Sequence, residues 1–535
     1  MRRAVLWAAI ALVLVTAACR RVYGEGPQVV MRVALSVSLP IEFLLEQDAL
    51  VFPVLSAEPS AEPARDENEA WRGLAVAGNQ PYISLVPSKE PFRIRAGDVP
   101  GEVVLCYPSG EAVSFLEGLR ILPADHASAA FQIGKRRYPG GLEVSYAASK
   151  GGSCEVTAIN LVDLETYTEG VLAGEVYSSW APEALKAQAV ATRTYALRRM
   201  SENKSRNYDV DDTVLSQVYL GKNGVEAFRT AVRETHGQVL VYEGVPIRAH
   251  YFSSGGGTTE GDEEVWLGGN DEPYLTARED FDWMSPHYRW KEPFAIEGSD
   301  LLAKLGLKPD HEGWIEPSIW SADKILAYRF CAGGGTINLT REQIRQKLGL
   351  QSPRFHVTVR DSEGQEVAME SRMELGSSTV VIFDGVGKGH GVGLSQWGAQ
   401  GMALMCKSDG VPIYDYVDIL KHYYPGVELV DNYNIPKKLI EPVSEEHAEP
   451  VYEGSVEPAQ PVEEDHTEST YEDDHEYDTD VIEDDHTVHV YDEHAEFMKE
   501  DPTDPVCDDH TAPTYEDDKK QTKPDYGDHI EFLLE

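Results

Sequence analysis

The sequence predicts an α+β protein, because strand-like and helix-like segments are mixed without the regular alternation of a doubly wound sheet. Residues 29–38 alternate and are rich in valine, and short β-prone runs broken by glycine and proline continue from 102 to 161. From 164 to 200, apolar residues recur at helical spacing with few breakers. With 535 residues, 42% of them hydrophobic, the chain can form several packed cores.

The first residues have the pattern of an export signal. Arg2 and Arg3 precede an apolar run from Ala4 to Ala18, and Cys19 follows it. The run is too short to span a bilayer comfortably, and no later stretch is apolar enough to do so. We therefore expect residues 1–19 to be a signal peptide and the protein to be exported, to the outer face of the cytoplasmic membrane, the periplasm or the cell wall. Lipidation of Cys19, ordinary cleavage after Ala18 and an uncleaved anchor remain alternatives.

Helices and a hairpin are expected in the second half of the chain. Pro182 and Glu183 suit the first turn of a helix, where proline is tolerated and an acid complements the helix dipole. Turn residues at Glu243-Gly244 favour a hairpin between Val239–Tyr242 and Ile247–Phe252. Further helices are expected over residues 228–236, 341–348, 394–405 and 414–423.

The carboxyl-terminal region differs in composition from the rest. From Glu441 to Glu535 there are 34 acidic residues against four lysines, so this segment carries −30 of the net charge of −44. Such a composition cannot bury enough apolar surface to offset chain entropy, which predicts a disordered, acidic, His-rich tail over residues 436–535. A divalent-ion buffer is an alternative to a plain solvated tail. This charge opposes nucleic-acid binding.

One glutamate is a candidate general acid. Glu175 stands at the expected end of a helix among small and apolar residues, with Gly174 leaving space beside it. Desolvation would raise the pKa of such a carboxyl, which suits proton donation. A glutamate on a helix surface is the alternative that spacing alone leaves open.

Two glycine-rich stretches are candidate binding loops. Residues 249–260 carry Ser253, Ser254 and Thr258 around consecutive glycines, so hydroxyl and backbone N–H groups could bind sugar hydroxyls or carboxylates. In the second stretch, residues 387–399, alternating glycines flank His390, and we expect Ser395, Gln396 and Trp397 to open a helix and line a cleft. Trp397 could stack on a sugar, although a core tryptophan is the alternative. No nucleotide-loop lysine and no nucleophile elbow are present.

Seven segments in this order resemble the SpoIID/LytB family, that of stage II sporulation protein D and its relatives. The resemblance covers about Leu142 to Val427 and rests on NLVDLETYTEGVLAGEV, PEALKAQAVATRTYAL, GQVLVYEGVPIRAHYFSSGGGTTE, VW followed by PYL, REQIRQKLGLQSPRF, GVGKGHGVGLSQWGAQGMA and ILKHYYPGV. Together with the patterns at the two ends of the chain, it leads us to expect four parts: the signal peptide 1–19, a β-rich region 20–135, a SpoIID-like domain 136–435 and the tail 436–535.

The resemblance implies a lytic transglycosylase that cleaves peptidoglycan glycan strands, preferably those without peptide stems, between N-acetylmuramic acid and N-acetylglucosamine. The family's catalytic glutamate falls on Glu175, although Val176 replaces the usual methionine after it. Gln188, Arg193 and Tyr195 match the helix that lines the family's groove. A non-catalytic enhancer of a cell-wall amidase and a glycan-binding lipoprotein are the alternative functions. The expected partners are therefore glycan strands and a cell-wall amidase.

No cofactor or metal is expected. Some members of the family bind zinc through cysteine and histidine, but Ser253 and Ser254 stand where cysteine would be needed. The six cysteines form no Cys-x-x-Cys pair, which also opposes a thiolate zinc site.

Overall fold

The computed structural model describes residues 29–54, 83–123, 130–148, 154–204, 206–269, 271–308, 313–322, 324–407, 411–431 and 433. The expected signal peptide, Cys19 and the acidic tail lie outside these residues. The described helices and sheets confirm the mixed α+β class. In the described segments, no helix combines the length and the apolar character needed to cross a membrane.

The first part of the chain forms two antiparallel β-sheets that share one core. A parallel pair with the short strand β13 extends the first sheet at its edge. In strand order, the seven-stranded sheet contains β13 (Val210–Asp211), β1 (Val30–Leu35), β12 (Cys154–Asp163), β11 (Gly141–Ala148), β8 (Gly118–Pro123), β3 (Ala49–Pro53) and β4 (Ile83–Leu85). The six-stranded sheet contains β10 (Arg136–Pro139), β9 (Ala130–Ile133), β2 (Ile41–Leu45), β5 (Phe92–Ala96), β6 (Glu102–Cys106) and β7 (Ala112–Leu116).

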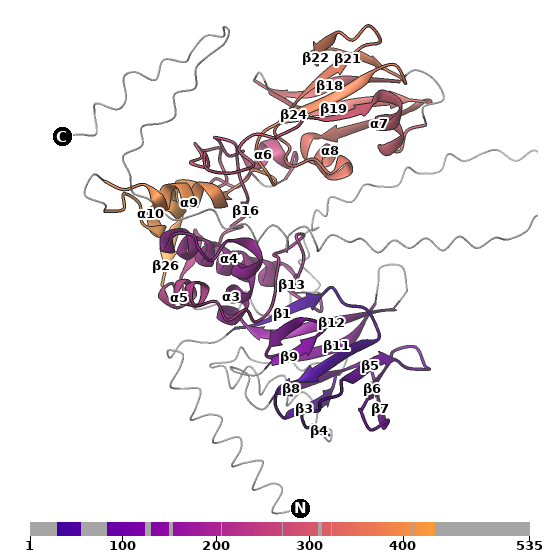
Figure 1. Ribbon diagram of the computed structural model, residues 1–535, viewed down its shortest axis with the longest axis vertical. Helices are drawn as coiled ribbons and strands as arrows, with labels where there is room; N and C mark the ends of the chain where they lie inside the picture. The colour runs from indigo at the N-terminus through magenta and orange to yellow at the C-terminus, as the bar shows by residue number, and fades with distance from the viewer. Residues whose placement is uncertain are drawn as a thin grey trace, which may run out of the picture. The chain divides into compact units, whose positions relative to one another are not determined.

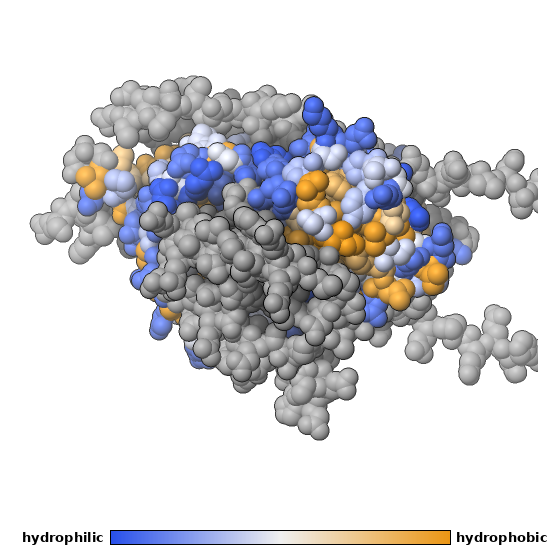
Figure 2. Space-filling view, turned by 90° about the horizontal axis from the view of Figure 1, so that it is seen from below, coloured by the Kyte–Doolittle hydropathy of each residue, from blue (hydrophilic) through white to orange (hydrophobic). Residues whose placement is uncertain are grey.

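Alternation along these strands builds their shared core. Val33 of β1, Phe43 of β2 and Ile94 of β5 are buried in one hydrophobic cluster, whereas Glu42 and Arg93 beside them are exposed. Outside this core, one face of the molecule gathers hydrophobic residues in an area bordered by hydrophilic ones (Figure 2).

The sheets continue past residue 135 because β10, β11 and β12 pair within them, so the expected limit of the β-rich region does not end a sheet.

A helical layer follows the sheets and is built around one central helix. α4 (Pro182–Glu202) contacts four other helices, which surround it in Figure 1. Its alanine-rich sequence allows this close packing, and Ala187, Ala189 and Val190 are completely buried. The other helices of this layer are α3 (Leu164–Glu175), α5 (Glu226–Glu234), α9 (Gln396–Leu404) and α10 (Tyr416–Tyr423).

Short strands complete the helical layer, and they correct one expectation. β14 (Val239–Tyr242) pairs with β15 (Val245–Pro246) and with β26 (Glu428–Val430). The expected second hairpin strand does not continue to Phe252. Instead β16 (Tyr251–Phe252) leaves the hairpin and pairs in parallel with β25 (Leu394–Ser395).

Between α6 (Asp262–Val265) and β25 the chain forms a separate β-rich lobe with its own core. One sheet has the order β17 (Phe294–Glu297), β24 (Val380–Gly385), β21 (Phe355–Arg360) and β22 (Glu366–Ala368). The other has the order β20 (Gly335–Thr340), β19 (Lys324–Ala332), β18 (Gly313–Ser321) and β23 (Met373–Leu375). The lobe also holds α7 (Gly298–Lys304) and α8 (Arg341–Leu348); the sequence predicted the bounds of α8, which has a capping box at Thr340 and ends at left-handed Gly349.

Candidate functional site

Glu175 is the last residue of α3, and the preceding Gly174 allows another segment of the chain to pack closely beside it. Asp163 caps the start of the helix by accepting from the Thr166 amide at 2.9 Å. A Cβ atom on Gly174 would lie 2.4 Å from the Val218 carbonyl oxygen. The helix therefore rests directly on the segment that carries Val218, and the space at Gly174 is filled by this chain.

Three hydrogen-bond donors surround the Glu175 carboxyl. The Val218 amide donates to Oε1 at 2.8 Å, and the Gln396 side-chain amide donates to Oε2 at 3.4 Å. The Tyr251 hydroxyl is the third partner. The donors come from a loop, from β16 and from the first turn of α9, so three distant segments meet at this carboxyl.

Burial raises the pKa of Glu175 to about 7, and the three hydrogen bonds act in the opposite direction. The residue is half-buried and thus keeps contact with solvent. A carboxyl in this state can give up and take back a proton near neutral pH, as a general acid and base must.

A buried polar chain holds Tyr251 in place. The Gln217 side chain donates to the Tyr251 hydroxyl at 3.0 Å and accepts from the Tyr167 hydroxyl at 2.9 Å. Gln217 and Tyr167 are almost completely buried. Tyr251, Gln217 and Val218 are not among the residues predicted from the sequence for the site. A backbone amide such as that of Val218 leaves no signal in residue type.

Two histidines lie close to Tyr251. The rings of His250 and His390 are 5.8 Å apart, and Trp266 packs against both, at 4.8 and 5.3 Å. Burial lowers the pKa of His250 to about 3 and the pKa of His390 to about 4, so both rings are neutral at physiological pH. His390 accepts from the Val392 amide at 3.1 Å, so its orientation is fixed by the backbone.

The first glycine-rich loop is bound by acidic residues of this chain. The Gly255 amide donates to Asp280 at 3.0 Å, and the Gly256 and Gly257 amides donate to Asp282 at 2.7 and 2.9 Å. The buried Ser254 hydroxyl also donates to Asp282. These groups are therefore engaged inside the protein and do not face a ligand, in contrast to the expectation for Ser254. Ser253 is half-buried and Thr258 is exposed.

The second glycine-rich stretch packs against the first. Gly389 and Gly393 have φ of 98° and 82°, and a Cβ on Gly393 would lie 2.2 Å from the His250 carbonyl oxygen. The alternating glycines thus allow two backbone segments to approach each other. The stretch ends at Ser395, a buried N-cap whose hydroxyl accepts from the Gly398 amide at 3.1 Å.

The remaining predicted residues divide between the site and the core. Gln396 contacts Glu175 directly, and the Tyr195 ring lies 5.8 Å from the His250 ring. Trp397 is buried, and its ring centroid lies 5.1 Å from that of Trp180. It therefore packs in the core, which was the alternative to stacking on a sugar.

Gln188 and Arg193 are both buried in α4. The Gln188 side chain is 1% exposed and donates to Thr192 at 3.3 Å. Arg193 is fully buried, with ion pairs to Glu165 at 2.5 and 2.8 Å. The expectation that Arg193 lines an open groove is therefore not met, because its charge is neutralised within the core.

The residues at the first glycine-rich loop do not fit a thiolate zinc site. The Ser254 hydroxyl is committed to Asp282, and the hydroxyls of serine replace the sulfur ligands that such a site needs.

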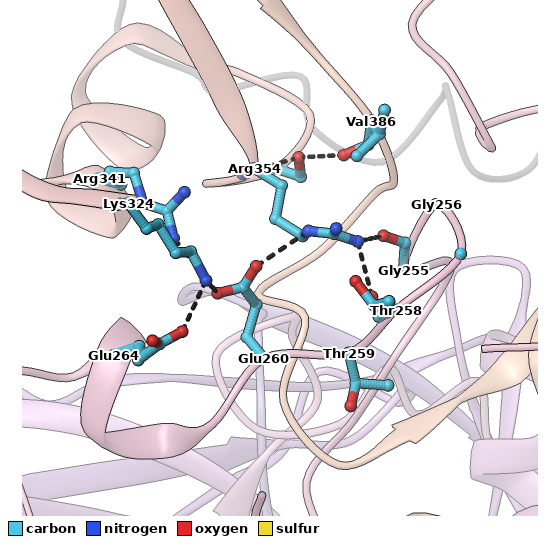
Figure 3. A network of polar contacts seen from close by, with 12 residues as sticks. Gly255, Gly256, Thr258, Thr259, Glu260, Glu264, Lys324, Arg341, Arg354 and Val386 are labelled. Atoms are coloured by element: carbon cyan, nitrogen blue, oxygen red, sulfur yellow. Dashed lines mark hydrogen bonds and ion pairs between the residues drawn. The ribbon is translucent and has the colours of Figure 1, made fainter. Parts of the chain in front are cut away.

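A buried glutamate, Glu260, lies where the loop meets the β-rich lobe (Figure 3). Glu260 is 2% exposed, and three cationic side chains of the lobe converge on its carboxylate. Arg354 approaches at 2.9 Å and Arg341 at 3.2 Å, and Lys324 pairs with both Glu260 and Glu264. Arg354 also donates to the carbonyl oxygens of Gly255 and Thr258. These contacts fasten the lobe to the loop.

Comparisons with known proteins agree with these features. The family described as "SpoIID: Stage II sporulation protein" matches residues 153–242, which include α3, α4 and Glu175. The chain is 32% identical to stage II sporulation protein D of Bacillus amyloliquefaciens, over 51% of this chain and 75% of that protein. It is 31% identical to stage II sporulation protein D of Bacillus subtilis, over 51% and 76%. It is also 30% identical to an amidase enhancer of Bacillus subtilis, over 49% of this chain and 40% of that protein. The chain therefore belongs to the SpoIID/LytB family, that of stage II sporulation protein D and its relatives.

Proposed function

We propose that this protein is exported through residues 1–19 and remodels the cell wall as a lytic transglycosylase. Its substrate is the glycan strand of peptidoglycan, cleaved between N-acetylmuramic acid and N-acetylglucosamine. The observation that carries the proposal is the half-buried Glu175 carboxyl, whose pKa burial raises to about 7 among donors that carry no charge. Family membership supports the substrate class.

The reaction needs one carboxyl that acts twice. Protonated Glu175 gives its proton to the bridging oxygen as the glycosidic bond breaks. The resulting carboxylate then takes the proton of the muramic acid 6-hydroxyl, whose oxygen attacks the anomeric carbon and closes a 1,6-anhydro ring. Hydrolysis would instead need a second carboxylate to act on water or on the sugar. The partners that the structure gives Glu175 are an amide, a carboxamide and a phenol, which suits the one-carboxyl route.

The donors around Glu175 have a role in each half of the cycle. Val218, Gln396 and Tyr251 stabilise the carboxylate after it has lost its proton, so that both forms remain accessible. We assign Gln396 to positioning the carboxyl. Neutral His390 and Tyr195 remain candidates for contact with the sugar, as does the exposed Thr258.

Activity of the full-length protein on stem-free glycan tests the proposal. We expect it to release anhydro-muropeptides, and Glu175→Gln to lower the rate about 10²- to 10⁴-fold without loss of fold. Glu169→Gln is the matched control, because Glu169 is a half-buried acid on the same helix whose Arg229 contact is long, at 3.9 Å. Full activity of the Glu175→Gln protein, measured by mass analysis of the products, would exclude the mechanism.

Enhancement of a cell-wall amidase is the second candidate function, favoured by the likeness to the amidase enhancer of Bacillus subtilis. It requires no proton transfer at Glu175. If it is the only function, the protein alone leaves glycan intact, and Glu175→Gln stimulates an added amidase as well as the unchanged protein does. Glycan binding without either effect would indicate a wall-binding role.

A further inference from the structure

Residues 260–274 contain six acidic residues, and they fall into two groups. Three of them have cationic partners. Glu260 and Glu264 pair with Lys324, and Glu272 pairs with Arg248 at 3.3 Å. Within the part of the chain that the structure describes, the other three form no ion pair with lysine or arginine, and these are Asp262, Glu263 and Asp271.

The three acids without a cation converge. One carboxylate oxygen from each of Asp262, Glu263 and Asp271 lies within 4.8 Å of the others. Glu263 folds back over Gly261, where a Cβ would lie 2.3 Å from its carboxylate. Like charges this close repel one another unless something neutralises them.

The innermost of the three also has an unsatisfied oxygen. Asp262 is 4% exposed; its Oδ2 accepts from the Glu272 amide at 3.1 Å, but its buried Oδ1 has no hydrogen-bond partner in the described structure. Buried carboxylate oxygens are costly when nothing compensates for the lost water. A cation bound by this oxygen and the two exposed carboxylates would supply that compensation.

We propose that Asp262, Glu263 and Asp271 bind a calcium ion. Calcium takes oxygen ligands in flexible geometry and accepts carboxylates in one- or two-oxygen contacts, with water completing the shell. Magnesium demands a near-ideal octahedron, and zinc favours nitrogen and sulfur ligands, so this all-carboxylate set suits calcium best. The expectation of no metal rested on the missing thiolate ligands of a zinc site, whereas this site uses carboxylate oxygens.

The position of the site gives the ion a structural task. Asp262 and Asp271 flank the turn that carries Trp266, whose amide donates to the Asp262 carbonyl at 2.8 Å. Trp266 packs on His250 and His390 beside Tyr251 and Glu175. A calcium ion would join the two ends of this turn and fix the indole against the histidines. The binding itself does not depend on the proposed function.

Thermal unfolding of the full-length protein tests the proposal. We expect millimolar calcium, compared with a chelator, to raise the midpoint by about 2–4 °C, since weak extracellular sites have dissociation constants near 10⁻⁴–10⁻³ M. Asp262→Asn and the exposed Asp271→Asn should each remove most of this shift. Asp384→Asn is the control, because it removes one exposed acid from β24 and should keep the shift.

Terbium luminescence sensitised by tryptophan provides the second measurement. The segment 441–535 contains many acids but no tryptophan, so ions bound there should contribute little to this signal. We expect calcium to displace terbium from the unchanged protein, and the signal to fall in both site variants. An unchanged midpoint in calcium, or an equal shift in all four proteins, would overturn the proposal. Asp271→Asn keeps the test valid if Asp262→Asn does not fold.

Discussion

Glu175 and Glu260 are two carboxylates partly or fully shielded from water, and they differ in the charge of the groups around them. Glu260 meets three cationic side chains and pairs through its backbone with Gly391, so its charge is neutralised and it holds the lobe to the loop. Among the described residues, the hydrogen-bond donors to Glu175 are all uncharged, and burial raises its pKa to about 7. The comparison teaches that burial alone does not mark a catalytic acid. What matters is whether the surroundings leave the proton free to move near neutral pH.

The same substitution at the two glutamates should have opposite effects on stability. Glu260→Gln leaves three partly buried cations without their carboxylate, and we expect it to lower the free energy of unfolding by about 2–3 kcal/mol. Glu175 has a folded-state pKa above its unfolded value, so its ionisation costs stability as pH rises from about 4.5 to 7. Glu175→Gln removes that cost, and we expect it to stabilise the protein by about 1–2 kcal/mol at pH 8 after allowance for partial exposure.

Chemical denaturation at pH 5 and pH 8 measures both effects. The gain from Glu175→Gln should be present at pH 8 and nearly absent at pH 5, where the carboxyl of the folded protein is protonated. Equal losses from the two variants at pH 8 would show that the two surroundings do not differ as described.

Placing a cation beside Glu175 should make it resemble Glu260. The Gln396 carboxamide lies 3.4 Å from Oε2, so Gln396→Lys should lower the pKa of Glu175 by about one unit, and less acid will be protonated at pH 7. Gln396→Leu removes the donor and should move the pKa upward. The rate of anhydro-muropeptide formation against pH measures both shifts.

In the unchanged protein, that rate should fall as pH rises through about 7. His250 and His390 should not add an ionisation above pH 5, because burial holds the pKa values of both rings low. Profiles that shift in the same direction for both Gln396 variants would contradict the assigned role of the carboxamide.

The smallest effect is expected from removing the Tyr251 hydroxyl. Tyr251→Phe removes one of the hydrogen bonds that lower the pKa of Glu175, so the apparent pKa should rise by about half a unit. Tyr195→Phe is the control for the apparent pKa alone, whatever its effect on the rate, because this ring packs on His250 and is not among the hydrogen-bond partners of Glu175. An identical profile for the unchanged protein and both variants would remove Tyr251 from the site.

The sequence predicted the helices and strands better than it predicted which groups pack against them. Helical spacing and Pro182 anticipated the helices around Glu175, and its setting and the family resemblance both pointed to this glutamate, whose catalytic role stays a prediction. The space beside Gly174 was expected to admit a ligand, but the Val218 carbonyl fills it. The glycines near His390 likewise admit the backbone at His250. A glycine in the sequence indicates that another group approaches the backbone closely, but only the folded structure shows which group that is.

The partners of buried charged side chains could not be predicted from the sequence either. Asp280 and Asp282 bind the loop, and Arg193 is paired inside the core, yet their residue types alone are equally typical of surface side chains. The pairing of Lys324, Arg341 and Arg354 with one glutamate depends on a lobe whose strands are distant in sequence. Such contacts follow from topology, which local patterns do not fix.

Glu175 and Gln396 are 221 residues apart along the chain, which has a consequence for chains that are cut short or still being synthesised. A nascent chain that has passed Glu175 still lacks the carboxamide that α9 delivers, and it also lacks the lobe that fastens the loop. An incomplete or clipped product therefore carries the acid without its finished surroundings. The surroundings of the Glu175 carboxyl are therefore complete only in chains that extend past residue 404.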